Sequence, residues 1–189
     1  MEKLKILAIS GSLRKDSYNW KALQIAKRFA AEPDSIVEEI DLKELNLPFY
    51  DNNQEVEGPP EPVRKLKAAI EAADVLLIAA PEYNYSISAV LKNMIDWGSR
   101  KGNSFNGKFA VIFGASTGPS GTLRAQNQLR LILTAVNVFV LPQPQVFIRH
   151  AKDVFDEKGE LKDEKVKEQL KKLVEKTLVW ARKLKDSKQ

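Results

Sequence analysis

The chain has 189 residues, of which 43% are hydrophobic and 29% charged, with a net charge of +5, one histidine and no cysteine. This composition excludes collagen-like, disordered and disulfide-stapled proteins, as well as cysteine nucleophiles and His/Cys metal centres. No apolar run approaches the roughly 20 residues of a membrane span, and no secretory leader is recognisable, so we expect a cytoplasmic protein with no membrane partner.

Apolar runs of strand length alternate with helical patterns along the chain. Strands are predicted over residues 5–10, 35–42, 74–80, 109–115 and 136–141. Helices are predicted over residues 20–31, 62–73, 88–100 and 123–135, followed by a charged C-terminal helix. Continuous apolar strands separated by helices indicate one α/β domain, residues 1–189, with a parallel sheet covered on both faces.

The C-terminal segment holds most of the excess positive charge. Residues 157–189 carry 11 Lys/Arg and 7 Asp/Glu. Helical spacing also places one apolar face here, made of Val166, Leu170, Leu173, Val174, Leu178, Ala181 and Leu184. We interpret the segment as a helix docked by that face, with solvated lysines on the other. No nucleic-acid partner is expected, because aromatics do not interleave with the charges; a nucleic-acid-binding module stays as an alternative.

The connection over residues 43–61 is unusually long. It contains a Leu-Pro-Phe-Tyr run and a Gly-Pro-Pro turn. Unstructured connections of this length are usually lids or contact surfaces. We therefore expect a structureless loop that covers a site or contacts a subunit partner.

The loop after the first strand has the composition of a phosphate site. Gly11 permits a sharp turn. Ser12, Ser17 and Asn19 offer neutral donors, Arg14 offers a charged fork, and the following helix offers free N–H groups. The Walker and dinucleotide glycine patterns are both absent, which favours a mononucleotide without bound magnesium.

Two further loops follow the third and fourth strands. Pro81-Glu82-Tyr83-Asn84-Tyr85 offers flat faces and amide groups that suit a planar ring, although both tyrosines could be ordinary loop anchors. The loop from Ala115 to Gly121 could be only a flexible turn, or it could let the backbone approach a ligand closely. Strand order 2-1-3-4-5 would bring these loops beside the phosphate loop at the topological switch point, where α/β sheets bind ligands.

Together these residues resemble the NADPH-dependent FMN reductases, most closely the bacterial quinone and chromate reductases. The resemblance is carried by Gly11-Ser12-Leu13-Arg14 with Ser17 and Asn19, by Pro81–Asn84, by residues 91–97 and by Gly114–Ser116. It implies a flavodoxin-like three-layer sandwich, a homo-oligomer (dimer or tetramer) and bound FMN with NADPH or NADH as co-substrate. The implied cofactor-binding residues are Ser12, Leu13, Arg14, Ser17, Tyr18, Asn19, Pro81, Glu82, Tyr83, Asn84, Ser116, Thr117 and Gly118. Metal and catalytic side chains are not implied.

The resemblance implies an enzyme that passes a hydride from NAD(P)H through FMN to a small acceptor such as a quinone, free flavin, azo compound or chromate. The protein's part is to orient and polarise the flavin. The alternative is a flavodoxin-type electron carrier, although such carriers are acidic and this chain is basic. Two departures occur, at Ser88-Ala89, where many relatives have Pro-Gly, and at Ser120-Gly121, where many have Gly-Gly. Lys92, Asn93, Asp96 and Trp97 are interpreted as packing and capping residues, and His150 has no assigned role.

Overall fold

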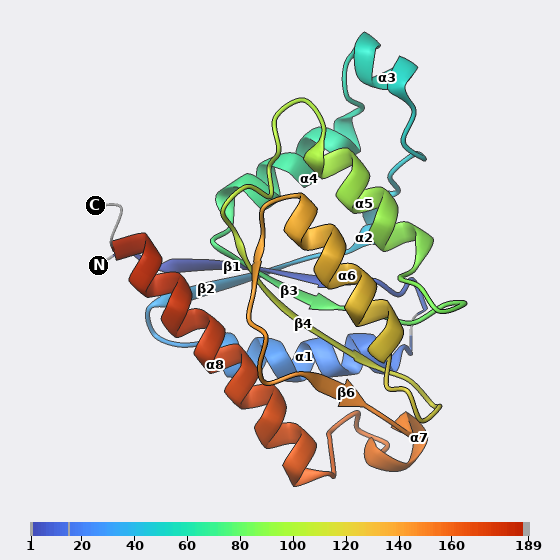
Figure 1. The fold of residues 1–189 in the computed structure, drawn as a ribbon, viewed down its shortest axis with the longest axis vertical. Helices are drawn as coiled ribbons and strands as arrows, with labels where there is room; N and C mark the ends of the chain where they lie inside the picture. The colour runs from blue at the N-terminus through green and yellow to red at the C-terminus, as the bar shows by residue number, and fades with distance from the viewer. Residues whose placement is uncertain (1, 15, 187–189) are drawn as a thin grey trace.

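The computed structural model describes residues 2–14 and 16–186. Its centre is a parallel sheet of order β2-β1-β3-β4-β5, and a short β6 also pairs with β4 (Figure 1). The strands are β1 (Leu4–Ser10), β2 (Ser35–Ile40), β3 (Val75–Ala79), β4 (Phe109–Ala115), β5 (Phe139–Val140) and β6 (Val146–Ile148). The α/β class and the predicted strand order are confirmed.

Helices cover both faces of the sheet (Figure 1). One face packs on α1 (Tyr18–Ala30) and α8 (Glu164–Asp186). The other packs on α4 (Glu61–Ala72), α5 (Ala89–Ser99) and α6 (Leu123–Ala135). Successive residues of a strand face opposite sides, so Leu77 joins the α1/α8 core while Leu76 and Ile78 join the other. This alternation explains why β3 is apolar throughout.

The register aligns the ends of the central strands. Ser10 pairs with Ala79, and Ala79 pairs with Phe113. The loops that follow β1, β3 and β4 therefore leave the sheet at one edge, as the sequence pattern predicts.

The fifth predicted strand, over residues 136–141, is much shorter than expected. Only Phe139–Val140 forms β5, and pairing with β4 resumes at β6 after Pro142 and Pro144. Prolines have no backbone N–H to contribute to a sheet, so the chain leaves β4 between the two short strands. The second strand also ends earlier than expected, because Asp41 caps the short helix α2 (Leu42–Leu45).

The connection over residues 43–61 is partly helical, which corrects the expectation of a structureless loop. It contains part of α2 and all of α3 (Asn52–Glu57), which projects from the body of the domain (Figure 1). The Asn93 side chain donates to the Pro48 carbonyl at 2.8 Å and accepts from the Tyr50 N–H at 2.8 Å. The Trp97 indole N–H also donates to Pro48 at 2.8 Å. These contacts hold the segment on α5 and agree with the packing interpretation of Asn93 and Trp97.

The C-terminal helix docks by its predicted apolar face. Leu170, Leu173, Val174, Leu178 and Ala181 are buried in the core, and lysines on the outer face pair with Glu164 and Glu175. No helix among residues 2–14 and 16–186 is long and apolar enough to cross a membrane.

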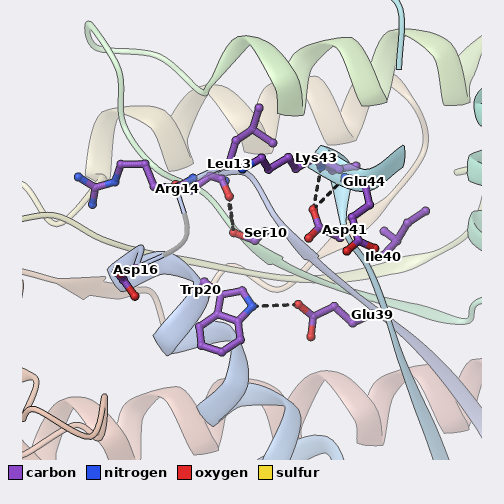
Figure 2. Close-up of a pocket in the computed structure, with 12 residues that line it drawn as sticks. Ser10, Leu13, Arg14, Asp16, Trp20, Glu39, Ile40, Asp41, Lys43 and Glu44 are labelled. Carbon is purple, nitrogen blue, oxygen red and sulfur yellow. Dashed lines mark hydrogen bonds between the residues drawn. The ribbon is translucent and has the colours of Figure 1, made fainter. Parts of the chain in front are cut away.

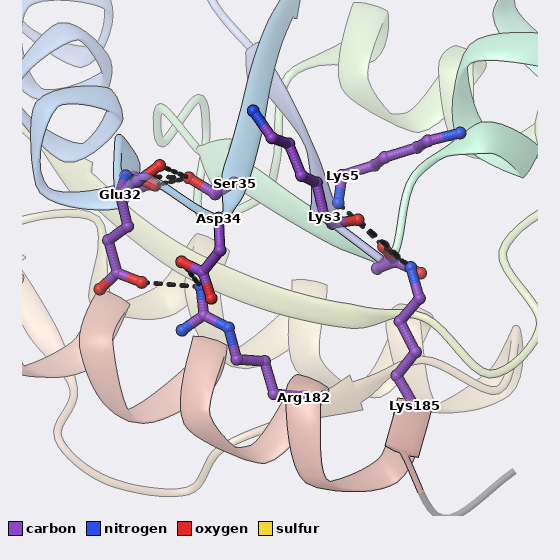
Figure 3. Close-up of polar contacts among 9 residues, drawn as sticks. Lys3, Lys5, Glu32, Asp34, Ser35, Arg182 and Lys185 are labelled. Atoms are coloured by element: carbon purple, nitrogen blue, oxygen red, sulfur yellow. Dashed lines mark hydrogen bonds and ion pairs between the residues drawn. The ribbon is translucent and has the colours of Figure 1, made fainter. Parts of the chain in front are cut away.

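Ion pairs fasten the end of α8 to the strand beginnings, as Figure 3 shows. Arg182 pairs with Glu32 and Asp34 at 2.7 and 2.9 Å. The Lys185 ammonium lies 3.0 Å from the Asp74 carboxylate, which also accepts the Lys5 backbone N–H at 2.8 Å. Asp74 thereby joins the start of β1 to the end of α8.

Replacing Lys185 by methionine is expected to lower the free energy of unfolding by about 1 kcal/mol at pH 7. Burial lowers the pKa of Lys185, but the hydrogen bonds and charges of Asp74 and Glu2 outweigh this effect and raise it. The pair's contribution is therefore present below the ordinary lysine pKa of about 10.4 and is lost as pH rises through the raised folded value.

Urea unfolding of the wild type and Lys185→Met between pH 7 and pH 11 measures this contribution. The difference should shrink at the alkaline end, whereas exposed Lys172→Met should change little at any pH. A difference that persists undiminished at pH 11 would contradict the assignment.

Candidate cofactor site

A pocket of about 300 Å³ lies where the loops after β1, β3 and β4 meet. Its lining consists of Ser12, Arg14, Ser17, Tyr18, Asn19, Pro81, Glu82, Tyr83, Ala115, Ser116 and Thr117. The structure thus brings together most of the predicted site residues. Leu13, Asn84 and Gly118 are adjacent but do not line this pocket, and Ala115 is a lining residue that the prediction missed.

The β1–α1 loop forms a cradle for an anion. Ser17 caps α1, and its Oγ accepts the Asn19 N–H at 3.2 Å. The Ser12 hydroxyl accepts the Arg14 N–H at 3.4 Å. The Arg14 guanidinium is exposed and has no ion pair or hydrogen bond within the described part of the chain. A guanidinium with no partner among the described residues, in the same pocket as a helix N-terminus, is a donor set suited to a phosphate monoester, and so fits the FMN phosphate.

The side chain of Asn19 is bonded within the protein. Its Nδ2 donates to the Ala115 carbonyl at 3.0 Å, and its Oδ1 accepts the Ala115 N–H at 2.9 Å. The side chain is buried, and both of its polar atoms are used. The carboxamide therefore joins α1 to the end of β4, and Asn19 and Ala115 both line the pocket.

Close backbone packing sets the position of the cradle. A Cβ at Gly11 would lie 2.8 Å from the Pro81 ring, so a side chain there would push the first and second loops apart. The Ser88 hydroxyl donates to the Gly11 carbonyl at 2.6 Å and also caps α5. Ser88 therefore ties α5 to the phosphate loop.

Glu82 stabilises the second loop from inside. Its carboxylate accepts the backbone N–H groups of Arg124 and Ala125 at 3.0 and 3.3 Å, and its side chain is 7% exposed. A carboxylate at a helix N-terminus is favourable because the exposed N–H groups carry partial positive charge. The Glu82 side chain is thus committed to α6, and Pro81 beside it lines the pocket.

Residues 83–86 form a tight turn that projects two tyrosines. Tyr83 and Ser86 exchange backbone hydrogen bonds of 2.9 Å, and Asn84 and Tyr85 both have positive φ, at 48° and 68°. Tyr83 and Tyr85 are 50% and 67% exposed. Tyr83 lines the pocket and gives it an aromatic edge.

Two residues of α6 hold this turn, and sequence reasoning missed both. The Gln128 side chain donates to the Tyr85 carbonyl at 2.9 Å and accepts from the Ser86 hydroxyl at 2.6 Å. The Arg124 guanidinium donates to Glu82 at 2.6 Å and stacks over the Tyr85 ring at 4.0 Å. They lie about 40 residues further along the chain, and no local sequence pattern connects them to the turn.

The third loop is anchored by backbone contacts. The Gly118 N–H donates to the Ser116 Oγ at 3.0 Å. The Ser116 N–H donates to the Ile148 carbonyl, and the His150 N–H donates to the Gly118 carbonyl, at 3.0 and 3.2 Å. His150 therefore contributes through its backbone, at the start of the short helix α7 (Ala151–Val154).

Lys92 and Asp96 need no role in the site. Their side chains pair with each other on α5 at 2.7 Å, four residues apart. Across residues 2–14 and 16–186, no group of three or more His, Cys, Asp or Glu side chains is placed to hold a metal ion.

Comparison with known proteins connects this geometry to one family. The sequence profile described as NADPH-dependent FMN reductase matches residues 4–153. An NAD(P)H-dependent FMN reductase of Pseudomonas aeruginosa is 42% identical over 184 residues, which cover 97% of this chain and 98% of the relative. A 2-hydroxy-1,4-benzoquinone reductase of a Burkholderia species is 37% identical over 95% of this chain and 97% of its own length.

Among solved structures, the chain is similar to FerB, a flavoenzyme NAD(P)H:(acceptor) oxidoreductase of Paracoccus denitrificans. The two superpose with a TM-score of 0.85 at 32% identity, over 95% of this chain and 98% of FerB. The fold and the length of the relatives therefore agree with those of this chain.

Proposed function

Because the chain belongs to the NADPH-dependent FMN reductase family, we propose that it is an FMN-dependent oxidoreductase that takes a hydride from NADPH or NADH and passes electrons to a small oxidised acceptor. One observation carries the assignment to these residues. The same pocket is lined by Arg14, whose guanidinium has no partner among the described residues, by the N-terminus of α1, and by Pro81 and Tyr83.

The side chains hold and orient the cofactor. Arg14, the Ser12 hydroxyl and the N–H groups at the start of α1 would bind the phosphate of FMN. Pro81, Tyr83 and the 116–118 loop would line its ring. Bound FMN supplies the hydride chemistry, so these residues need no general acid or base. Glu82 acts from behind the site by keeping its loop on the N-terminus of α6.

The acceptor binds at the open side of the pocket. Tyr83 and Tyr85 stand exposed there and offer flat surfaces to planar molecules such as quinones, azo compounds and free flavins. The names of the Burkholderia and Paracoccus relatives, which specify a benzoquinone and an unspecified acceptor, support this breadth. Chromate is proposed as a further, non-planar acceptor. The electron-carrier alternative gains no support from these relatives.

We also propose a homo-oligomer, a dimer or tetramer, built through the projecting α3 region. Phe49 and Val56 are 80% and 69% exposed on that projection. Large exposed apolar side chains on a protruding element are typical of subunit contacts. A cytoplasmic location is proposed because the reaction consumes NAD(P)H.

A visible absorption spectrum tests the function directly. Purified protein, loaded with FMN and freed of excess, should show a bound-flavin spectrum that bleaches on anaerobic addition of NADPH or NADH. A flavin that binds but stays oxidised would overturn the reductase in favour of an electron carrier. Failure to bind FMN at all would overturn the cofactor site.

A further inference from the structure

A cavity of about 790 Å³ lies beside Trp20, between the carboxyl ends of β1 and β2. Its lining is net acidic, with the carboxylates Asp16, Glu39, Asp41 and Glu44 against the cations Arg14 and Lys43. Figure 2 shows the Arg14 guanidinium directed away from Glu39 and Asp41. This cavity therefore does not suit an anionic dinucleotide. The aromatic turn of residues 83–86, after β3, offers a different kind of surface.

This turn has a conformation that its sequence does not favour. Asn84 and Tyr85 have φ angles of 48° and 68°, in the left-handed region. Asparagine tolerates that region, but a bulky residue such as tyrosine is rarely found there, because its Cβ crowds the backbone. Backbone strain of this kind persists only where surrounding contacts impose it, and it is concentrated at ligand-binding sites.

Helix α6 supplies contacts that impose this conformation. The Gln128 amide donates to the Tyr85 carbonyl at 2.9 Å, and its Oε1 accepts from the Ser86 hydroxyl at 2.6 Å. Arg124, four residues earlier on the helix, places its guanidinium 4.0 Å from the centre of the Tyr85 ring. Glu82 fixes Arg124 in turn by accepting from its Nε at 2.6 Å. We call this set of contacts from Arg124 and Gln128 to the turn the clamp.

The clamp leaves aromatic surface open to solvent. Arg124 stacks on the Tyr85 ring, yet Tyr85 remains 67% exposed. Tyr83, at the start of the same turn, is 50% exposed and lines the cofactor pocket. The turn therefore carries flat, uncharged rings at the edge of the site. Planar conjugated molecules stack on such rings, whereas compact, non-planar ones make little contact with them.

We propose that the clamp sets the acceptor selectivity of the enzyme by holding Tyr85 as a rigid platform for planar acceptors. Gln128 is a positioning residue, because it acts through Tyr85. A ring that is fixed before the acceptor arrives loses no further conformational entropy when the acceptor binds. Quinones and azo compounds therefore depend on the clamp, and compact acceptors do not. The inference rests on the proposed reductase function and adds the residues that select among acceptors.

Two acceptors of different shape measure this selectivity. Menadione is a planar quinone, and ferricyanide is a compact octahedral ion. Each reduced nucleotide converts one menadione to its hydroquinone, with uptake of one proton, or two ferricyanide ions to ferrocyanide, with release of one proton. With the FMN-loaded protein and saturating NADPH or NADH, kcat/KM is measured for each acceptor. The ratio of the two values reports selectivity and cancels differences in cofactor loading or in the amount of folded enzyme.

Two variants separate the clamp from the ring. Gln128→Ala keeps the ring but frees the turn, so the ratio of menadione to ferricyanide should fall about three- to tenfold, chiefly through a higher KM for menadione. Tyr85→Gly removes the ring, while glycine adopts positive φ without strain, and it should lower the ratio by a similar factor. Neither substitution changes the net charge, so the attraction of the ferricyanide anion is preserved. Asn127→Ala, at the exposed neighbouring position, should keep the wild-type ratio.

The outcomes distinguish this inference from the function on which it rests. If the wild type reduces neither acceptor with NADPH or NADH, the reductase function itself fails. If it reduces both, and the ratio is unchanged in Gln128→Ala and Tyr85→Gly, the platform is overturned while the reductase stands. A merely structural role of Gln128 would lower both kcat/KM values alike and leave the ratio unchanged. A fall of the ratio in only one of the two variants would overturn the link between clamp and ring.

Discussion

Replacing Arg14 by alanine is expected to weaken FMN binding about 10- to 100-fold, because a charge-assisted hydrogen bond to phosphate contributes roughly 1.5–3 kcal/mol. The Arg14 guanidinium is exposed and unpaired among the described residues, so its removal breaks no contact that the fold requires. The free energy of unfolding of the apoprotein should therefore stay within about 0.5 kcal/mol of the wild type. The dissociation constant is measured by quenching of flavin fluorescence on titration with apoprotein.

Arg28 provides a matched control for Arg14. Arg28 lies in the last turn of α1 and pairs with Glu160, far from the cradle. Arg28→Ala should bind FMN as the wild type does, and Arg14→Lys should recover part of the lost affinity through its charge alone. Equal FMN affinity in Arg14→Ala and the wild type would contradict the cradle.

Replacing Asn19 by alanine is expected to lower the free energy of unfolding by about 2–4 kcal/mol. The substitution leaves the N–H and the carbonyl of Ala115 without their partners in a buried place, and each orphaned group costs roughly 1–3 kcal/mol. Urea unfolding of the apoprotein measures the loss. FMN binding should weaken as well, because the end of β4 is no longer fixed against α1.

Exposed Asn127 on α6 provides the comparison for Asn19. Asn127→Ala should change the free energy of unfolding by less than about 0.5 kcal/mol. Asn19→Asp tests the geometry further, since a carboxylate can accept from the Ala115 N–H but cannot donate to its carbonyl. Asn19→Asp should therefore also lower the free energy of unfolding. An apoprotein of Asn19→Ala with wild-type stability would contradict this structural role of Asn19.

The sequence predicted the architecture well because local patterns encode it. The β4 strand and the α6 helix begin and end where their apolar patterns do, at Phe109–Ala115 and Leu123–Ala135. Burial on both faces makes a parallel strand apolar throughout, and docking by one face makes a helix amphipathic. Patterns fail where backbone chemistry overrides them, as at Pro142 and Pro144, which separate β5 from β6.

The loops of the site were recognisable for the same reason. Gly11, Ser12 and Arg14 lie within four residues, so composition marks the first segment as a candidate ligand loop, whereas the segment after Pro81 could equally be an ordinary loop. The strand order then determines that they meet, since parallel strands end at a common edge. The candidate site was thus located from local composition and one topological argument, and the family resemblance supplied its cofactor.

What the side chains do within that site was decided by tertiary structure. Asn19 and Glu82 look like ligand groups in the sequence, yet contacts with Ala115 and Arg124 occupy them. The cavity beside Trp20 likewise exists only because β2 lies next to β1. A sequence determines which polar groups are present, but their partners come from residues distant in the chain. Which groups remain free for a ligand is therefore settled only when the chain has folded.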